Sequence, residues 1–325
     1  MISNRYPLII TGPTASGKTD LAEEIAQQMG GEIINIDVGQ FYEPLSVGTA
    51  KPDWQKKSFT CHFFDILNEP CELSVAAYRN RMLTLVDEIV RRGKLPIIVG
   101  GSLFYIKSLF FPPHEQFLQK DLHRDQECID LSSSSSELWN TLNNIDPIRA
   151  QALHHNDRYR IVRALQIWQT TGQKPSNFEP RFNPPFSAHI IFLVPPKDIL
   201  LQRISMRTRQ MIDSGAWIHE AKNLLGSPWE DFIRRKGLIG YTQIFEWLKF
   251  RTTPLDELIA DIVQETNQYA KRQMVFLKKF KKQLEEQVLH SSQTISFREI
   301  SGATHTSFDF STSRSDFPSN KQGER

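Results

Sequence analysis

Cysteine is scarce in the sequence and is not arranged in pairs. Three cysteines occur among 325 residues, at Cys61, Cys71 and Cys128, which is an odd number without a C-x-x-C pair. This pattern argues against a disulfide framework and against a structural zinc site. The fold must therefore depend on an apolar core, for which 39% hydrophobic residues suffice.

Long apolar runs and an excess of one charge are also missing. No apolar run approaches the roughly 18 residues of a membrane span, and the N-terminus has no basic region followed by a cleavable apolar segment. We therefore expect a cytoplasmic protein without a membrane partner. The formal net charge is +2 at pH 7, so any nucleic-acid surface has to be a local patch.

The chain is organised around residues 7–26. A short apolar run is followed by GPTASGKT at positions 12–19 and then by apolar residues at helical spacing. All eight positions satisfy the phosphate-binding motif G-x-x-x-x-G-K-[ST] in the required strand, loop and helix order. The two glycines let backbone amides turn toward an oxyanion, Lys18 can reach the outer phosphates, and Thr19 can ligate Mg²⁺. The sequence therefore predicts a phosphorylated ligand.

Two predicted strands end in different kinds of residue. Residues 32–37 end in Asp37, at the edge where a parallel sheet binds ligands. Asp37 is thus a candidate general base or water-mediated metal ligand, with helix capping as the alternative. Residues 95–99 end in two glycines and then Ser102, where a nucleotide hydrolase would carry an acid that holds Mg²⁺. This departure disfavours nucleotide hydrolysis.

The remaining predicted elements follow from apolar periodicity. Strand-like runs occur at 61–67 and 187–196, and helical spacing occurs at 73–93, 154–168, 198–225 and 256–288, with a glycine-containing turn into a helix at 236–244. The polar stretch 112–136 includes a five-serine tract, which is typical of a linker into a small helical insertion. From residue 291 the chain lacks periodicity, which predicts disorder.

Basic residues gather in two places in the second half. Between Lys271 and Lys282 there are six cations and no acid, interleaved with Met and Phe, a composition suited to an RNA backbone. Arg203 and Arg207 stand at i and i+4, so their guanidinium groups share a helix face and could clamp a diphosphate. In both places a solvated helix face is the alternative.

Taken together, these motifs resemble those of the bacterial tRNA dimethylallyltransferases, also called tRNA isopentenyltransferases. The matching pieces run collinearly from about residue 8 to 280 and are GPTASGKT, Asp37 with Gln40 and Tyr42, GTAKP, GGSLFY, HHNDRYRIVRAL, Arg203 with Arg207 and Met211, IGYTQ and YAKRQ. The resemblance implies transfer of a dimethylallyl group from dimethylallyl diphosphate to the exocyclic amine of the adenosine 3′-adjacent to the anticodon in tRNA.

The resemblance also implies a role for each matching residue. The implied catalytic residues are Asp37 as general base, Ser102 in a position that is usually Thr, and Arg207 on the diphosphate. The implied diphosphate-binding residues are Gly12, Pro13, Thr14, Ala15, Ser16, Gly17, Lys18, Thr19 and Arg203, with Thr19 also on Mg²⁺. The implied tRNA-binding residues are Asp37, Val38, Gly39, Gln40, Ser102, Arg124, Tyr159, Arg160, Ile161, Val162, Arg163, Lys236, Gly240, Tyr241, Lys271, Arg272 and Lys278.

Two positions depart from the family pattern. Val38 follows Asp37 where the family commonly has Ser, which removes one polar group near the nucleotide. Leu103 replaces a residue that is often Gly or Met, which would reshape the prenyl pocket. Neither change removes a residue that the chemistry needs.

The expected fold class is α/β, a P-loop NTPase-like parallel sheet flanked by helices, with a small helical insertion domain. We expect residues 1–111 and 186–290 to form the core, 112–185 to form a mainly helical insertion that contacts tRNA, and 291–325 to be a disordered tail. The expected cofactor is Mg²⁺, and the expected partners are the tRNA anticodon stem-loop and dimethylallyl diphosphate. The oligomeric state is left open, with a monomer as the expectation.

Three other functions share parts of this pattern. A small-molecule or nucleoside kinase would use the same phosphate loop, but a small acceptor would not need the basic, aromatic helix near the C-terminus. An adenylate isopentenyltransferase acting on free AMP could share the first half of the motifs. A non-catalytic RNA-binding protein with this loop would be expected to lose Lys18 or Asp37, and both are present.

Overall fold

The computed structural model describes residues 6–112, 131–250, 253–289 and 292–301. The chain divides into two compact units. The first comprises Met1–Glu72, Val86–Leu103 and Phe186–Arg325, and the second comprises Leu73–Leu85 and Phe104–Pro185. The second unit is thus larger than the insertion expected at 112–185, since it also takes in segments that precede residue 112.

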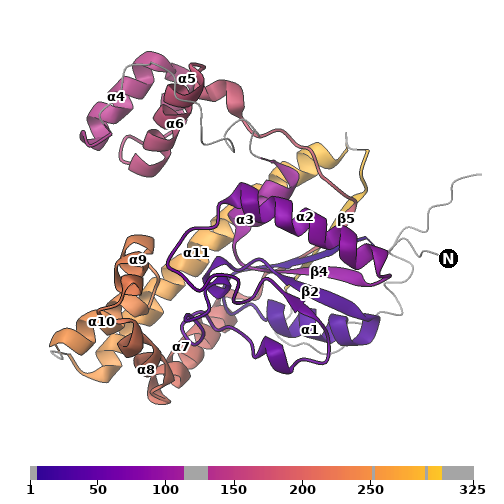
Figure 1. The fold of residues 1–325 in the computed structure, drawn as a ribbon, viewed down its shortest axis with the longest axis vertical. Coiled ribbons are helices and arrows are strands. Elements are labelled where there is room, and N and C mark those ends of the chain that lie inside the picture. The colour runs from indigo at the N-terminus through magenta and orange to yellow at the C-terminus, as the bar shows by residue number, and fades with distance from the viewer. Residues whose placement is uncertain (1–5, 113–130, 251–252, 290–291, 302–325) are drawn as a thin grey trace, which may run out of the picture. The chain divides into compact units, whose positions relative to one another are not determined.

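A parallel six-stranded sheet forms the centre of the first unit (Figure 1). Its strands are β1 (Leu8–Thr11), β2 (Gly31–Asn35), β3 (Cys61–His62), β4 (Leu95–Gly100), β5 (Ala188–Leu193) and β6 (Ile295–Ile300). They lie in the order β3-β2-β4-β1-β5-β6, and every neighbouring pair is parallel. The carboxyl ends of the strands therefore meet at one edge, where α/β sheets bind ligands. The predicted P-loop NTPase-like fold class is confirmed.

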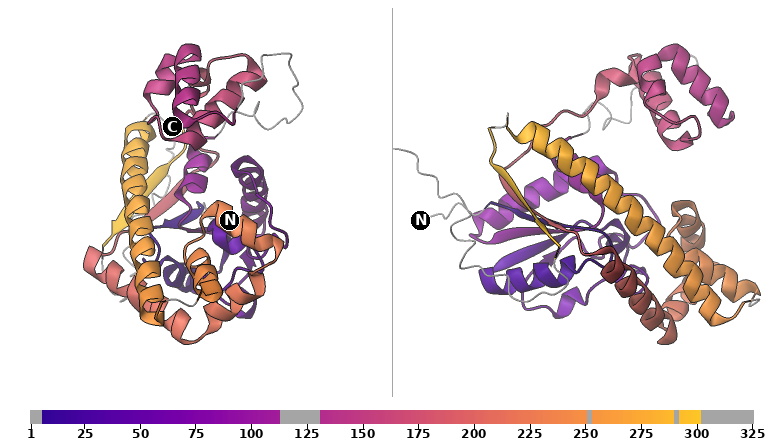
Figure 2. Two further views of the ribbon diagram at one scale, coloured as in Figure 1. Left: turned by 90° about the vertical axis from the view of Figure 1, so that its left-hand side faces the viewer. Right: turned by 180° about the vertical axis from the view of Figure 1, so that it is seen from behind.

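Helices of the first unit pack on the sheet and on one another. They are α1 (Lys18–Met29), α7 (Lys197–Asp213), α8 (Ala216–Leu224), α9 (Pro228–Lys236), α10 (Tyr241–Phe250) and α11 (Leu255–Val288). The apolar face of α1 is buried against strand residues such as Ile33 and Ile97. On α11, Phe280 meets Phe192 of β5 edge-on, with ring centroids 6.4 Å apart. Figure 2 shows α11 as one continuous helix beside β6.

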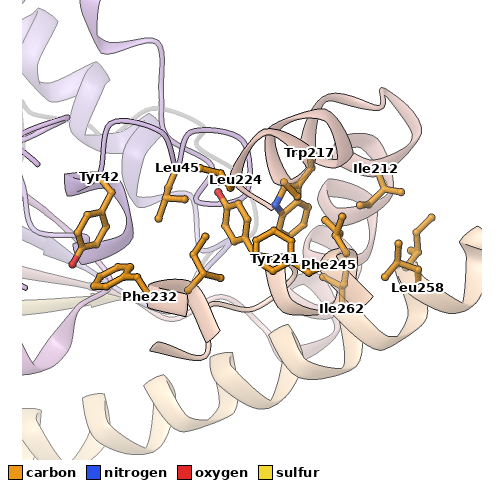
Figure 3. Close-up of a cluster of buried hydrophobic side chains, with 14 residues drawn as sticks. Tyr42, Leu45, Ile212, Trp217, Leu224, Phe232, Tyr241, Phe245, Leu258 and Ile262 are labelled. Atoms are coloured by element: carbon orange, nitrogen blue, oxygen red, sulfur yellow. The ribbon is translucent and has the colours of Figure 1, made fainter. Parts of the chain in front are cut away.

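A second apolar core in the first unit joins α7, α8, α9, α10 and α11 to the segment that follows β2 (Figure 3). Trp217 and Tyr241 pack edge-on in it, with ring centroids 5.8 Å apart. Tyr42 packs in the same way against Phe232, at 5.1 Å. Burial of so many aromatic and aliphatic side chains stabilises the loop after β2 relative to the helices. The loop that carries Asp37 is therefore held by a core and is not a free surface loop.

The second unit has its own apolar core. It contains α4 (Ser135–Ile145), α5 (Pro147–Gln151) and α6 (Arg158–Thr171), whose inward side chains form one buried cluster. Asp146 is fully buried between α4 and α5. Its carboxylate accepts the backbone N–H of Arg149 at 3.1 Å and that of Ser176 at 2.6 Å, so a buried charge is matched by hydrogen bonds.

Two further helices, α2 (Val75–Arg91) and α3 (Leu103–Phe110), contribute residues to both units. The structure confirms the helix predicted at 73–93 and the one predicted at 256–288, each within two residues of its ends. Among the described residues, no helix combines the length and the apolar composition needed to cross a bilayer.

Four predictions about elements were wrong. The strand expected at 61–67 is reduced to Cys61–His62, because Phe63 and Asp65 adopt positive φ angles of 63° and 52° that break the extended backbone. The helix expected at 198–225 is two helices, since Gly215 turns the chain at φ 70°. The last serines of the linker expected at 112–136 instead start α4, where Ser134 forms a capping box with Glu137.

The disordered tail expected from residue 291 was the fourth wrong prediction, because β6 occupies residues 295–300. The segment was missed because an edge strand buries few of its residues, so its polar composition masks the alternation. The rest of that tail and residues 113–130 lie outside the described residues.

Candidate active site

The phosphate loop connects β1 to α1 and is shaped by three special backbone positions. Gly17 has φ 87° and precedes the first residue of α1, and Ala15 adopts the left-handed region at φ 60°, a conformation that costs energy for a residue with a Cβ. At Gly12 a Cβ would lie 2.4 Å from the carbonyl oxygen of Leu193, so only glycine fits there. The backbone amides at the start of α1 form a site for an anion.

Two arginines of α7 reach this loop. Arg207 donates from Nη2 to Oγ1 of Thr14 at 2.7 Å, and Arg203 donates from Nη1 to the carbonyl of Ser16 at 3.4 Å. Burial lowers the pKa of Arg207, while the Asp37 carboxylate raises it. The i, i+4 spacing thus brings both guanidinium groups to the loop, and their role as a diphosphate clamp stays a prediction.

Lys18 lies at the centre of this positive region. Its Nζ is 3.4 Å from the carbonyl oxygen of Pro13. Burial lowers the pKa of Lys18, the Asp37 carboxylate raises it and the Arg207 guanidinium lowers it. Lys18, Arg207 and Asp37 are therefore electrostatically coupled within one small site.

Asp37 is positioned by a neighbour on β2 and by another in the segment that follows β4. Its backbone N–H donates to Oδ1 of the buried Asn35 at 2.9 Å, and the next N–H, that of Val38, donates to Oγ of Ser102 at 3.0 Å. The short 3₁₀ turn η1 (Val38–Phe41) begins here, but the Asp37 side chain makes no capping hydrogen bond to it within the described chain. Asp37 therefore stands at the N-cap position without a side-chain cap, and it lines the pocket.

Gly100 explains why β4 has no acid at its end. A Cβ at this position would lie 2.7 Å from the backbone nitrogen of Asp37 and 2.7 Å from the carbonyl carbon of Ile36. The chain after β2 crosses so close to the end of β4 that a side chain is excluded. The space of a hydrolase carboxylate is thus taken by the backbone that carries Asp37.

The wall opposite the phosphate loop is the segment that contains GTAKP. The Glu220 carboxylate accepts the backbone N–H groups of Ser46, Val47 and Gly48 at 2.9, 2.7 and 3.1 Å. Lys51 forms an ion pair with Asp65. These charged contacts hold the segment in one conformation.

These parts enclose one pocket. Its polar lining consists of Thr14, Lys18, Thr19, Glu23, Asn35, Asp37, Gln40, Thr49, Lys57 and Arg207, and its apolar lining consists of Ile33, Ala50, Pro52, Trp54, Phe64 and Val99 together with Cys61 and Gly100. Cationic side chains and apolar side chains therefore line the same cavity. That combination suits a ligand in which a phosphate group is joined to a small hydrocarbon group.

The residues present fit a magnesium ion. No group of three or more His, Cys, Asp or Glu side chains capable of holding a metal occurs in the described parts of the chain. Mg²⁺ usually takes few protein ligands and completes its octahedron with phosphate oxygens and water. Thr19 and Asp37 line the pocket, and the Thr19 hydroxyl is an oxygen donor of the kind that such an ion prefers.

The structure separates the residues expected to contact tRNA into exposed and buried ones. Lys271, Arg272 and Lys278 are exposed on α11, and Tyr159, Arg160 and Arg163 are exposed on α6 in the second unit. Lys236 is exposed and pairs with Glu72 at 2.5 Å. Val38, Gly39, Ser102 and Val162 are half-buried, and Arg124 lies outside the described residues.

Three of the residues expected to contact RNA are buried in the structure. Ile161 is fully buried in the core of the second unit. Tyr241 is 1% exposed and donates its hydroxyl to Glu220 at 2.5 Å. Gly240 is buried, and a Cβ there would lie 2.0 Å from the Trp217 ring. A sequence motif does not distinguish residues that contact a ligand from those that support them.

Gln40 is also largely buried, at 8% exposure. Its Nε2 donates to the carbonyl oxygens of Thr49 and Ala50 at 3.1 and 3.3 Å. Its side-chain amide therefore stabilises the wall of the pocket.

Sequence reasoning missed two residues that hold the site. Glu220 organises the GTAKP segment from α8, and the buried Gln273 of α11 bonds to both Thr14 and Gly101. Gln273 stands in the YAKRQ motif, and this position in the motif was the only signal that the sequence offered for it. Glu220 is an isolated acid on a helix, and no feature of the sequence indicated its role.

The fold and the pocket define an enzyme of the P-loop class that binds a phosphorylated ligand at the carboxyl edge of its sheet. Within that class the chain belongs to the IPP transferase family, whose family model matches residues 40–280. It is 34% identical over 281 residues to a tRNA dimethylallyltransferase of Geobacter sulfurreducens, covering 84% of this chain and 88% of the relative. It is 33% identical over 287 residues to one of Corynebacterium jeikeium, covering 85% and 89%.

The chain is also similar to solved structures of transferases of this kind. A eukaryotic dimethylallyltransferase acting on tRNA is similar with a TM-score of 0.72 at 25% identity, over 95% of this chain and 77% of that chain. The tRNA isopentenylpyrophosphate transferase from Bacillus halodurans is similar with a TM-score of 0.57 at 27% identity, over 96% and 94%. The chain is thus a transferase.

Proposed function

We propose that the chain transfers a dimethylallyl group from dimethylallyl diphosphate to the exocyclic amine of the adenosine 3′-adjacent to the anticodon in tRNA. The observation that carries the proposal is the pocket in which Lys18 and Arg207 lie together with the Asp37 carboxylate and apolar side chains. A cationic region for a diphosphate, an apolar lining for a prenyl group and a base for an amine are the three parts that this reaction needs.

The diphosphate is the leaving group, so its negative charge develops as the allylic C–O bond breaks. Lys18, Arg207 and the amides at the start of α1 stabilise that charge because they are fixed in place before the reaction. Arg203 supports the loop through the carbonyl of Ser16. When bound, Mg²⁺ would be held by Thr19 together with the diphosphate and would neutralise part of its charge.

Asp37 takes the proton of the attacking amine. The target adenosine has to leave its base stack to reach the pocket, as in other enzymes that modify bases. Ser102 accepts the N–H of Val38 and so keeps the Asp37 segment next to the acceptor. The allylic carbon becomes positively charged as the amine attacks, and the carboxylate of Asp37 also stabilises that charge.

Exposed cations supply the RNA surface in this proposal. Lys271, Arg272 and Lys278 of α11 contact phosphates, and Tyr159, Arg160 and Arg163 of α6 form the corresponding surface of the second unit. Phosphate contacts position the RNA, while the adenosine pocket selects the base. The eukaryotic structural relative acts on tRNA, which supports this assignment.

The test supplies dimethylallyl diphosphate with either AMP or an unmodified tRNA anticodon stem-loop and follows the mass of each acceptor. We expect the stem-loop to gain one dimethylallyl group and AMP to remain unchanged. Prenylation of AMP alone would favour an adenylate isopentenyltransferase. A reaction that requires ATP and phosphorylates a small acceptor would favour a kinase.

A further inference from the structure

A buried glutamine of α11 joins two parts of the active site that are distant in sequence. Gln273 is 7% exposed. Its Oε1 accepts the backbone N–H of Thr14 at 2.8 Å, and its Nε2 donates to the carbonyl of Gly101 at 3.0 Å. One side-chain amide therefore connects the phosphate loop to the segment that follows β4.

Each of the two partners of Gln273 is linked to a group that the proposed reaction uses: Thr14 by a hydrogen bond and Gly101 by a peptide bond. Thr14 accepts a hydrogen bond from Arg207 through its hydroxyl, so its position affects the diphosphate side of the site. Gly101 precedes Ser102, which holds the backbone beside Asp37. A shift of the Gln273 amide would therefore move both the diphosphate side and the acceptor side.

Gly101 leaves the space in which the amide lies. A Cβ at position 101 would be 2.8 Å from Nε2 of Gln273, whereas its next neighbours, the carbonyl oxygen of Gly12 and Nζ of Lys18, would be at 3.5 Å. The glycine and the glutamine thus fit each other as a pair. An amide side chain of this length both accepts from an N–H group and donates to a carbonyl at neutral pH.

We propose that Gln273 is a positioning residue for the transfer reaction. It sets the phosphate loop against the Gly101–Ser102 segment, and it does so from the same helix that carries the exposed cations Lys271 and Arg272. The inference rests on the proposed function, because it states how that site is held together. Gln273 does not contact either substrate in this proposal. It affects the placement of both substrates through Thr14 and Gly101.

The first test is Gln273→Met, which keeps the length of the side chain and removes both hydrogen bonds. We expect kcat to fall about a hundredfold, since small misplacements of reacting groups have effects of that size, and we expect the KM for dimethylallyl diphosphate to rise. The KM for the stem-loop should change little. Gln264→Met makes the same change at an exposed position of α11 and should leave all three parameters unaltered.

Unaltered kcat and KM in folded Gln273→Met would overturn the inference and leave the proposed function intact, because the wild-type chain would still prenylate the stem-loop. A wild-type chain that does not prenylate the stem-loop would instead overturn the proposed function. The two failures are thus distinguishable.

A second variant, Gln273→Glu, tests the inference independently of the first. A carboxylate accepts from Thr14 but cannot donate to Gly101, whereas a protonated carboxyl group does both. We expect the ratio of mutant to wild-type kcat to rise as the pH is lowered. A ratio that does not change with pH would contradict the role of the amide donor.

The pair itself is tested by a double-mutant cycle with Gly101→Ala. In the wild-type background the new methyl group displaces the Gln273 amide and should lower kcat/KM strongly. In a Gln273→Ala background the space is free, so the same substitution should have a much smaller effect. Equal effects in the two backgrounds would show that Gly101 and Gln273 act separately.

Discussion

At the scale of single residues, Lys18 and Asp37 have separate tasks within one pocket. Lys18 follows a glycine with a positive φ angle and points back toward the loop carbonyl of Pro13. Asp37 depends on Asn35 and on the absence of a side chain at Gly100. Their charges influence each other, yet in the proposed reaction Lys18 acts on the leaving group and Asp37 acts on the acceptor. Substitutions at the two positions should therefore have different signatures.

Lys18→Ala should abolish transfer and leave stem-loop binding nearly unchanged, because the lysine faces the diphosphate. Activity is measured by prenylation and RNA affinity by filter binding. Lys94→Ala, at an exposed lysine, is the matched control and should behave like the wild type. Loss of RNA affinity together with turnover would contradict this division of tasks.

Asp37→Asn should fold normally and lose about 10²–10⁴-fold in kcat, the range that general-base assistance contributes. The substitution keeps the shape of the side chain and removes the base. Rates are measured at saturating stem-loop, with Asp53→Asn at an exposed carboxylate as control. Near-normal turnover would mean that Asp37 only positions the acceptor.

At the scale of elements, α11 combines an apolar face with a basic one. Ala270, Gln273, Leu277 and Phe280 are buried, and Lys271, Arg272, Lys278, Lys279 and Lys282 are exposed. The remaining cation of the stripe, Lys281, pairs with Glu299 of β6 at 2.6 Å. Lys281 thus supports the fold, while the other five cations are exposed, with Lys282 at 4.0 Å from Glu286.

Replacing Lys271, Arg272 and Lys278 together by Ala should raise the KM for the stem-loop and flatten its salt dependence. Each lost phosphate contact should reduce the slope of log affinity against log salt by roughly one unit or somewhat less. Affinity for dimethylallyl diphosphate should not change. Lys281→Ala is the control, and it should lower the melting temperature while keeping the salt slope. An unaltered salt slope in a stably folded triple variant would show that the RNA surface lies elsewhere.

Elements with a strong local pattern were predictable from the sequence, and contacts across long separations were not. The phosphate loop follows from one motif, and β1 and β4 follow from continuous apolar runs. The edge strand β6 and the break at Gly215 carry weak local signals. Gln273 could not be assigned its role because its partners are 259 and 172 residues away. The burial of Ile161 and Tyr241 was not predictable because a motif does not reveal which side of a helix is buried.

At the scale of the whole molecule, two units have separate apolar cores. The first contains the pocket, and the second presents exposed basic residues on α6. A defect in the second core should therefore impair RNA use without impairing diphosphate binding. Substitution of Asp146 should produce such a defect, because its side chain is fully buried and accepts hydrogen bonds from two backbone amides.

Asp146→Ala should lower the free energy of unfolding of the second unit by about 3 kcal/mol, because it leaves buried N–H groups unpaired. Limited proteolysis should then cut within residues 131–185, and the KM for the stem-loop should rise. Binding of a non-reactive dimethylallyl diphosphate analogue should be unchanged. Asp157→Ala removes a partly exposed cap of α6 and should cost only about 1 kcal/mol. Equal sensitivity of both ligands to Asp146→Ala would show that the units do not fold separately.

The hydrogen bond between Thr14 and Gln273 has a consequence for how the protein is made. A ribosome synthesises roughly 5–20 residues per second. Thr14 and Gln273 are 259 residues apart, so Gln273 is made on the order of ten to fifty seconds after the phosphate loop. The loop is synthesised before Arg207, and Gln273 is synthesised later still. Throughout that interval the nascent chain lacks the Gln273 contacts with Thr14 and Gly101, and the site is completed only when this part of α11 has left the exit tunnel.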